Sequence, residues 1–259
     1  MTKKLNQKRF ELKGKLRSRK TMFAAWTSLA HPSVTEMFAK IGVDFIGIDI
    51  EHSTISQEQS QRIIAASQSG GSLCLPRVAT HNMEMIKRLL DSGADGLIVP
   101  MVETASQARE IASWMQYPPQ GIRGFGISRA QGYGFDFDQY INDWNESGFL
   151  IVQIESITAV DNIDKILSVD AIDGVMIGPY DISGSLGIPG QIEHAKVKKA
   201  AGRVIDACKK FGKGCGTQDI TPCKKSVCEK FDQGYTFVVL ASDIFILLEW
   251  GKKMQGIVS

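Results

Sequence analysis

Two carboxylates in the middle of the chain each follow an apolar run that resembles a strand. Glu155 comes directly after FLIVQI (149–154), and Asp181 lies three residues after GVMIG (174–178). If the two runs are parallel neighbours, both acids lie at the edge of the sheet where βα loops build active sites. Their hard oxygens suit Mg²⁺ or Mn²⁺, and two protein ligands leave most of an octahedral shell open to a chelating substrate. We therefore expect a divalent metal site; the alternative is a carboxylate pair neutralised by Arg77 or a lysine.

Further polar side chains stand where other strand candidates end. They are Trp26, Asp49, His52, Arg77 and Gln153. Because strand side chains alternate between faces, Gln153 should point to the same side as Glu155. The planar guanidinium of Arg77 could hold an oxygen that gains negative charge, or it could form a salt bridge to Glu155. His52 directly follows a strand beside acids, so it is the candidate proton carrier.

Two further features narrow the chemistry. The Gly178-Pro179 turn could offer the backbone N–H groups of Tyr180 and Asp181 to a carboxylate. A Schiff-base aldolase needs a lysine that projects from a strand into the site. The eight strand candidates contain only Lys213, at the very start of its strand. The lack of a better-placed strand lysine favours metal-assisted chemistry over an iminium mechanism.

The elements that must position these residues alternate between strand and helix. Eight apolar runs predict strands, at 24–27, 45–49, 75–78, 96–100, 150–154, 174–178, 213–217 and 237–240. Eight βα units in about 250 residues predict one (β/α)₈ barrel domain over 1–259. A doubly wound open sheet is the alternative. Gly and Pro interrupt the pattern between Tyr117 and Gly148, which predicts a long irregular excursion.

Composition limits the partners and the compartment. Of the 259 residues 43% are hydrophobic, and the formal net charge of +2 gives no general reason to expect nucleic acid. Residues 1–20 form a basic leader with nine Lys and Arg against Glu11 alone. We expect a solvated helix or mobile tail there, with a polyanion-binding arm as the alternative. The absence of a long apolar run and of a secretory pattern predicts a soluble, cytoplasmic protein without a membrane partner.

The cysteines give a weaker signal. Their number is odd and none forms a CxxC pair: they are Cys74, Cys208, Cys215, Cys223 and Cys228. In a chain without a secretory signal, this pattern is typical of reduced thiols. A zinc site formed by Cys215, Cys223 and Cys228 is an alternative, although their spacing matches no zinc knuckle.

Taken together, these motifs resemble the HpcH/HpaI family of class II, metal-dependent 2-oxo-acid aldolases. The segments that carry the resemblance are GVDFIGIDIEHSTIS (42–56), LPRV (75–78), IKRLLDSGADGLIVPMVETASQARE (86–110), YPPQGIRGFG (117–126), LIVQIES (150–156) and DGVMIGPYDISGSLG (173–187). The resemblance implies a (β/α)₈ barrel of the phosphoenolpyruvate/pyruvate type that assembles as a trimer or hexamer, with C-terminal helices exchanged between subunits.

The resemblance also implies a role for each matching residue. Glu155 and Asp181 match the metal ligands, for Mg²⁺, Mn²⁺ or Co²⁺. Arg77 matches the arginine that stabilises the pyruvate enolate, and Gln153 matches the glutamine near the bound oxo-acid. The residues expected to bind substrate are Trp26, Gln153, Gly178, Pro179, Tyr180 and Gln218.

Proton transfer would involve a second group of residues. His52 matches the histidine that acts at the hydroxyl of the aldol, and Asp49 lies where it would support this histidine. Asp91 matches an acid that partners the histidine from the adjacent subunit. Its helix runs antiparallel to the strands, so Asp91 should lie at the opposite barrel face of its own chain and reach a His52 only across an interface.

Three features depart from the family pattern. Tyr180 stands where a small residue is common, Gln218 stands near a position that is often apolar, and segment 128–133 also differs. The expected function is metal-dependent, reversible cleavage of a 4-hydroxy-2-oxo acid to pyruvate, or a related oxo-acid, and an aldehyde. The alternatives are an acyl-CoA lyase like the citrate lyase β subunit, or a catalytically silent oligomeric barrel that acts as a binding protein.

Overall fold

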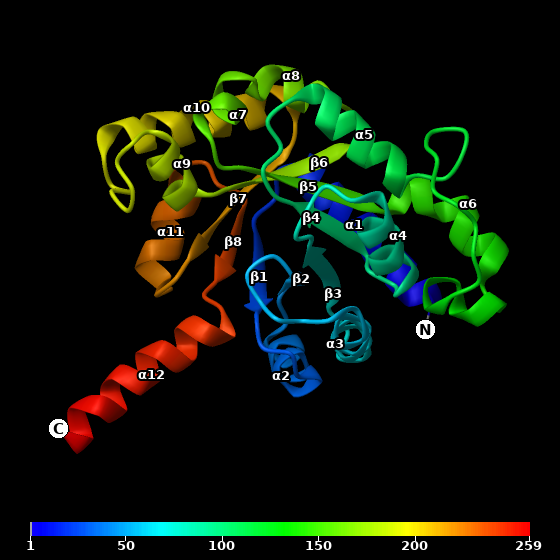
Figure 1. Cartoon of the computed structure of the whole chain (residues 1–259), viewed down its shortest axis with the longest axis horizontal. Coiled ribbons are helices and arrows are strands. Elements are labelled where there is room, and N and C mark those ends of the chain that lie inside the picture. The colour runs from blue at the N-terminus through cyan, green and yellow to red at the C-terminus, as the bar shows by residue number, and fades with distance from the viewer. Residues whose placement is uncertain (1) are drawn as a thin grey trace.

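Eight parallel strands form a closed barrel in the computed structural model, which describes residues 2–259 (Figure 1). The strands are β1 (Met22–Thr27), β2 (Phe45–Asp49), β3 (Leu73–Arg77), β4 (Gly96–Val99), β5 (Phe149–Ile154), β6 (Ile172–Ile177), β7 (Gly214–Asp219) and β8 (Phe237–Leu240). The barrel closes because β1 pairs with both β2 and β8. This closure confirms the (β/α)₈ prediction and excludes the open sheet.

Helices connect the strands and cover the barrel. They are α1 (Thr2–Arg17), α2 (Pro32–Ile41), α3 (Gln57–Ser69), α4 (Met83–Asp91), α5 (Ala105–Met115), α6 (Phe137–Ser147), α7 (Ile157–Asp161), α8 (Ile163–Leu167), α9 (Pro179–Ser185), α10 (Ala195–Phe211), α11 (Lys224–Asp232) and α12 (Asp243–Val258). Capping boxes begin α3 at Ser56 and α5 at Thr104. None of the helices in the described part of the chain is long and apolar enough to cross a membrane.

The basic leader forms α1, which packs across the amino-terminal end of the barrel. Leu12 and Leu16 are buried and join the hydrophobic cluster of the barrel interior. Glycines on the interior face of the strands leave room for these side chains: a Cβ at Gly214 would lie 2.6 Å from Leu16 Cδ2. Helix α1 therefore contributes to the core: the helix was predicted, whereas its description as solvated and the mobile-tail alternative are wrong.

Within one residue of the start of each even-numbered strand, a polar side chain accepts a hydrogen bond from a backbone N–H of the preceding odd-numbered strand. The four pairs are Asp44 with Phe23 (2.9 Å), Asp95 with Cys74 (2.9 Å), Asp173 with Leu150 (3.1 Å) and Thr236 with Cys215 (2.9 Å). The repeated position satisfies a backbone donor at the start of each strand pair, where the ladder has no partner for it.

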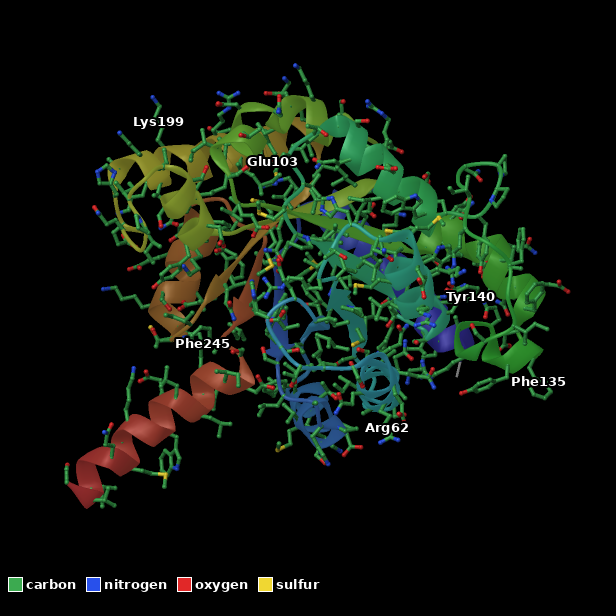
Figure 2. The ribbon with its side chains drawn as sticks, in the orientation of Figure 1. Arg62, Glu103, Phe135, Tyr140, Lys199 and Phe245 are labelled. Carbon is green, nitrogen blue, oxygen red and sulfur yellow. The ribbon has the colours of Figure 1, made fainter. Side chains whose placement is uncertain are left out.

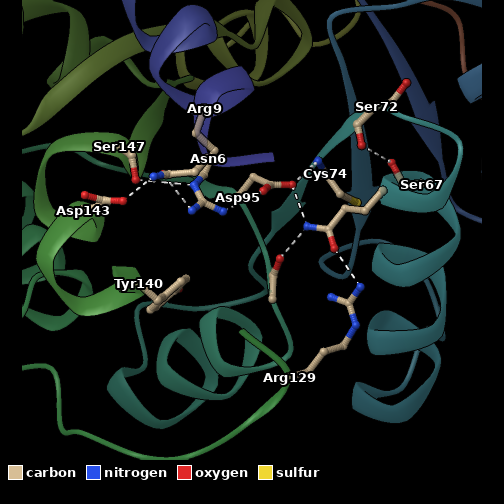
Figure 3. Close-up of polar contacts among 12 residues, drawn as sticks. Asn6, Arg9, Ser67, Ser72, Cys74, Asp95, Arg129, Tyr140, Asp143 and Ser147 are labelled. Carbon is tan, nitrogen blue, oxygen red and sulfur yellow. Dashed lines mark hydrogen bonds and ion pairs between the residues drawn. The ribbon is translucent and has the colours of Figure 1, made fainter. Parts of the chain in front are cut away.

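The positive charges of α1 pair with the three aspartates of this set. Lys15 Nζ lies 2.6 Å from Asp44 Oδ1, Arg9 Nη1 lies 3.3 Å from Asp95 Oδ1, and Arg17 Nε lies 2.7 Å from Asp173 Oδ1. Figure 3 shows Arg9 between Asp95 and Ser147, with Asn6 on Asp143. Burial raises the pKa of Asp95, and Arg9 opposes that shift. The basic leader is thus matched to buried acids of its own barrel, which argues against the polyanion-binding arm.

The predicted irregular stretch contains a helix that its sequence pattern did not indicate. Residues 117–128 are irregular, a 3₁₀ helix η1 (Arg129–Gly134) follows, and then α6 runs to β5. Tyr140 and Trp144, four residues apart on α6, are buried, and their rings stack with centroids 5.2 Å apart. This aromatic pair at helical spacing was the available signal, although α6 is otherwise mostly polar.

Candidate active site

Arg77, at the carboxyl end of β3, lies at the centre of the polar residues in the barrel mouth. Its Nη2 and Nε donate to the two carboxylate oxygens of Asp49, at 2.7 and 3.1 Å. Its guanidinium carbon lies 5.1 Å from the centroid of the Trp26 ring. Residues 49 and 77 are register partners on β2 and β3. The bidentate hydrogen bond to Asp49 and the Trp26 ring fix the orientation of the guanidinium. A fixed orientation suits a side chain that stabilises an oxyanion.

Glu51 also belongs to this group, although the sequence did not single it out. Its Oε2 lies 3.1 Å from Arg77 Nη1, outside hydrogen-bond direction, and has no hydrogen-bond partner among the described residues. Burial raises the pKa of Glu51; Arg77 opposes the shift, whereas Asp49 and Asp181 reinforce it. The signal that could have found it is its spacing from Asp49, the same two-residue step as from Gln153 to Glu155.

Glu155 is held by two donors at the end of β5. Gln153 Nε2 donates to its Oε2 at 2.8 Å, and the backbone N–H of Met101 donates to its Oε1 at 2.6 Å. Met101 reaches this position with a left-handed backbone (φ 51°), which is uncommon for a residue with a side chain. Burial raises the pKa of Glu155, and the charge of nearby Asp181 adds to the shift. The site therefore has an excess of negative charge around Glu155.

Asp181 lies in the first turn of α9, and Gly178 separates it from β6. A Cβ at Gly178 would lie 3.1 Å from Glu155 Oε2 and 3.4 Å from Asp181 Oδ2, so both carboxylates border the same space. Asp49 and Glu51 pair with Arg77, and Glu51, Glu155 and Asp181 lie close enough for their charges to act on one another. Two adjacent hard oxygen donors with unbalanced negative charge fit a divalent cation such as Mg²⁺ or Mn²⁺. Residues 2–259 contain no ligand cluster of three or more His, Cys, Asp and Glu, and Cys215 is buried while Cys223 and Cys228 are exposed, so the zinc alternative finds no support.

His52 and Asp91 lie outside this group in a single chain. The His52 side chain is 71% exposed at the rim of the barrel mouth, with Nε2 3.7 Å from Glu51 Oε2, and its backbone N–H donates to Asp49 Oδ1 at 3.0 Å. Asp91 ends α4 at the other end of the barrel and accepts a 2.9 Å hydrogen bond from Arg123. The position of Asp91 is the one expected for a residue that could act only in a neighbouring subunit.

The remaining predicted substrate-binding residues differ in whether they contact Arg77. Tyr180 is 56% exposed beside Pro179 at the start of α9. Gln218 lies near the end of β7, one step from Asp219. The geometry brings Trp26 and Gln153 to Arg77, while the substrate roles of Tyr180 and Gln218 stay predictions.

Similarity to known proteins agrees with this site. Residues 22–249 match the HpcH/HpaI aldolase/citrate lyase family. The chain is 37% identical to a hydroxypyruvate/pyruvate aldolase of Roseobacter denitrificans, over 91% of this chain and 92% of that one. It is 32% identical to a 5-keto-4-deoxy-D-glucarate aldolase of Klebsiella pneumoniae, over 94% of each. A solved structure of a family protein from Burkholderia cenocepacia superposes with a TM-score of 0.90 at 29% identity, covering 96% and 99% of the two chains.

A closed barrel with this arrangement of acids and arginine at its mouth is an enzyme of the carbon–carbon lyase class. The chain belongs to the HpcH/HpaI aldolase family. The resemblance drawn from the sequence is thereby confirmed, and so is the prediction of an aldolase. Divalent-metal dependence is a property of the family, which the two adjacent carboxylates fit.

Proposed function

We propose that this aldolase cleaves a 4-hydroxy-2-oxo acid, reversibly, to pyruvate or a related oxo-acid and an aldehyde. The observation that carries the proposal is the pairing of Glu155 and Asp181 beside Gly178, directly across from an arginine held by Asp49. Glu155 and Asp181 would hold Mg²⁺, Mn²⁺ or Co²⁺, which supplies Lewis-acid polarisation of the 2-oxo group. The aldolase names of the two relatives support this class of substrate.

The other residues of the site have separate roles in binding and in stabilising charge. Arg77 faces the 2-oxo oxygen and stabilises the negative charge that develops there. Gln153 is a positioning residue, because it accepts from Arg77 Nη1 at 3.4 Å and donates to Glu155 at 2.8 Å. Trp26 supports the guanidinium face. The backbone at Gly178 and Pro179 and the ring of Tyr180 border the entrance to the site.

The bond changes balance as follows. His52 takes the proton of the C4 hydroxyl, the C3–C4 bond breaks, and C4 becomes the carbonyl carbon of the aldehyde. The electron pair of the broken bond becomes the C2–C3 double bond of the enolate, with its charge on the oxygen facing Arg77. Proton delivery to C3 then yields pyruvate. Asp91 of a neighbouring subunit would orient His52, whose exposed position at the mouth leaves it accessible to such a partner.

The direct test is exchange of the pyruvate methyl protons in D₂O, followed by NMR with Mg²⁺, Mn²⁺ or Co²⁺ and then with excess EDTA. Exchange requires enolate formation and no aldehyde, so the unknown second substrate does not matter. We expect exchange with at least one cation and its loss in EDTA. Absence of exchange with every cation, in protein shown to be folded by circular dichroism, would contradict the proposal.

We also propose that the protein is a homo-oligomer, and α12 supports this. The buried carboxylate of Asp243 fixes the first turn by accepting from Thr27 Oγ1 at 2.7 Å and from Leu29 N at 2.9 Å. Beyond this turn α12 extends away from the barrel (Figures 1 and 2). Its exposed apolar residues are Ile244, Ile246, Leu247, Leu248, Trp250, Met254, Ile257 and Val258. Such an apolar surface is expected to be buried against another protein surface. In a second copy of the chain, the exposed side chains of Phe23, Met37 and Ile41 provide an apolar surface for α12 to pack on.

This assembly predicts a change of mass on substitution of Trp250. We expect light scattering to give a trimer or hexamer for the wild type and smaller species for Trp250→Asp, because a charge would be buried at the interface. Gln255→Asp, on the same helix at a polar position, is the control and should keep the wild-type mass. A monomeric wild type, or an unchanged mass for Trp250→Asp, would contradict the exchange of α12.

Cytoplasmic location also remains a proposal; the five unpaired cysteines of the described chain support it.

A further inference from the structure

Gln218 carries a buried amide that nothing in the site described above uses. Its Nε2 is shielded from solvent and has no hydrogen-bond partner among the described residues. Buried side-chain donors are nearly always paired in folded proteins, because an unpaired one loses its bonds to water without replacement. A donor left unpaired in the protein alone is one that a bound molecule can satisfy.

The pleat of β7 turns Gln218 towards the barrel interior. A Cβ at Gly216 would lie 2.0 Å from the ring of Phe237, an interior residue, so position 216 faces inward. Cys215 belongs instead to the cluster between barrel and helices. Since side chains alternate along a strand, Gln218 faces inward as position 216 does, one layer closer to the mouth.

The register of the neighbouring strands places this amide beside the two carboxylates. Met176 on β6 is the partner of Gly216, so Gly178 lies beside Gln218 two residues further along. Gly178 is also the residue that Glu155 and Asp181 border. On the other side, Gln218 pairs with Val239 of β8. Gln218 therefore lies next to the proposed cation site. Beyond it, β8 and then β1 form the next part of the barrel wall.

The residues of that part of the wall that face the barrel interior are uncharged, and the two acids nearby, Asp219 and Asp243, accept hydrogen bonds from Ser226 and Thr27. The ionisable groups of the site come from the ends of β2, β3, β5 and β6: they are Asp49, Glu51, Arg77, Glu155 and Asp181. The arc from β7 through β8 to β1 presents Gln218, Val239 and Trp26. A 2-oxo acid whose carboxylate and oxo group face the cation and Arg77 would direct its C3 substituent towards this arc.

We propose that Gln218 selects 2-oxo acids that carry a hydroxyl group on C3, by donating its amide N–H to that hydroxyl. The inference rests on the proposed function and specifies its nucleophilic substrate. A methyl group, as in pyruvate, leaves the buried donor unpaired, whereas a C3 hydroxyl satisfies it. A site that hydrogen-bonds a substrate hydroxyl discriminates strongly against analogues that lack the hydroxyl. An apolar pocket discriminates much less against analogues that carry an extra hydroxyl.

The experiment compares proton exchange at C3 of hydroxypyruvate and of pyruvate, with the cation that supports exchange and a no-enzyme blank for each. We expect the wild type to favour hydroxypyruvate in kcat/KM for exchange. Gln218→Leu keeps the side-chain volume and removes the donor, and it should lower the hydroxypyruvate-to-pyruvate ratio by about tenfold or more. Gln61→Leu, at an exposed glutamine on α3 outside the site, is the matched control and should keep the wild-type ratio.

Each outcome decides one question. A ratio unchanged in Gln218→Leu would overturn the role of Gln218 while leaving the aldolase proposal intact. No exchange of either acid by the wild type with any cation would instead overturn the aldolase proposal itself. If Gln218→Leu does not fold, Gln218→Met gives the same comparison, because it also lacks a donor but is more flexible.

Discussion

Glu155→Gln should abolish metal-dependent exchange of pyruvate while the fold stays intact. The amide keeps the size of the side chain and can still accept from the Met101 N–H, but it removes a charged ligand from the cation site. We expect exchange to fall by about a thousandfold or more, since a Lewis-acid cation supplies several kcal/mol of transition-state stabilisation. NMR exchange assays at saturating cation measure this loss.

Thermal unfolding gives a readout that does not depend on catalysis. A cation present at a hundred times its Kd stabilises the folded state by about 2.7 kcal/mol, which for a chain of this size raises Tm by roughly 5–10 °C. We expect this rise in the wild type and in Glu58→Gln, an exposed control on α3, but not in Glu155→Gln. A Tm rise of wild-type size in Glu155→Gln would mean that the cation binds elsewhere.

Arg77→Ala should damage both stability and activity. Removal of the guanidinium takes away the positive charge that pairs with Asp49 and Glu51. The side chains of these two acids are only 7% and 17% exposed. Uncompensated charges in such surroundings typically cost about 3–5 kcal/mol. Urea unfolding at neutral pH should show a loss of this order in the free energy of unfolding, and the exchange activity should disappear with the group that faces the oxo oxygen.

Two companion variants separate charge from geometry. Arg77→Ala combined with Asp49→Asn removes one stranded charge and should recover part of the lost stability without restoring activity. Arg88→Ala breaks an exposed pair with Glu84 on α4 and should cost less than about 1 kcal/mol. If Arg77→Ala unfolds with the same free energy as Arg88→Ala, the polar group at the mouth does not stabilise the fold as described.

The barrel and most of its site could be predicted because their signals are local. Most strands are apolar runs of four to six residues, although β7 is not, and site residues follow such runs directly, as Glu155 follows β5. The closed topology then brings the strand ends together, so residues 49, 77 and 155 meet although they are distant in sequence. In a parallel barrel the position along a strand therefore predicts the position in the site.

Other features depend on contacts that no local pattern records. The charges of α1 look solvated in sequence because their acidic partners lie far along the chain: Asp95 is 86 residues from Arg9. Glu51 lies beyond the last residue of β2; its spacing from Asp49 was a weak signal, and its distance from Arg77 shows that it belongs to the site. The exposure of His52 was equally hidden, because a loop residue after a strand can turn either way.

The contacts of α1 also bear on the order in which the protein can fold during synthesis. Helix α1 is made before the barrel strands, but Asp173, which accepts from Arg17, is made 156 residues later. Until β6 emerges, the basic residues of α1 lack part of their acidic partners, and Leu16 lacks the barrel interior that buries it. Helix α1 is thus made before the barrel but can dock only late, and completion of the barrel floor waits for most of the strands.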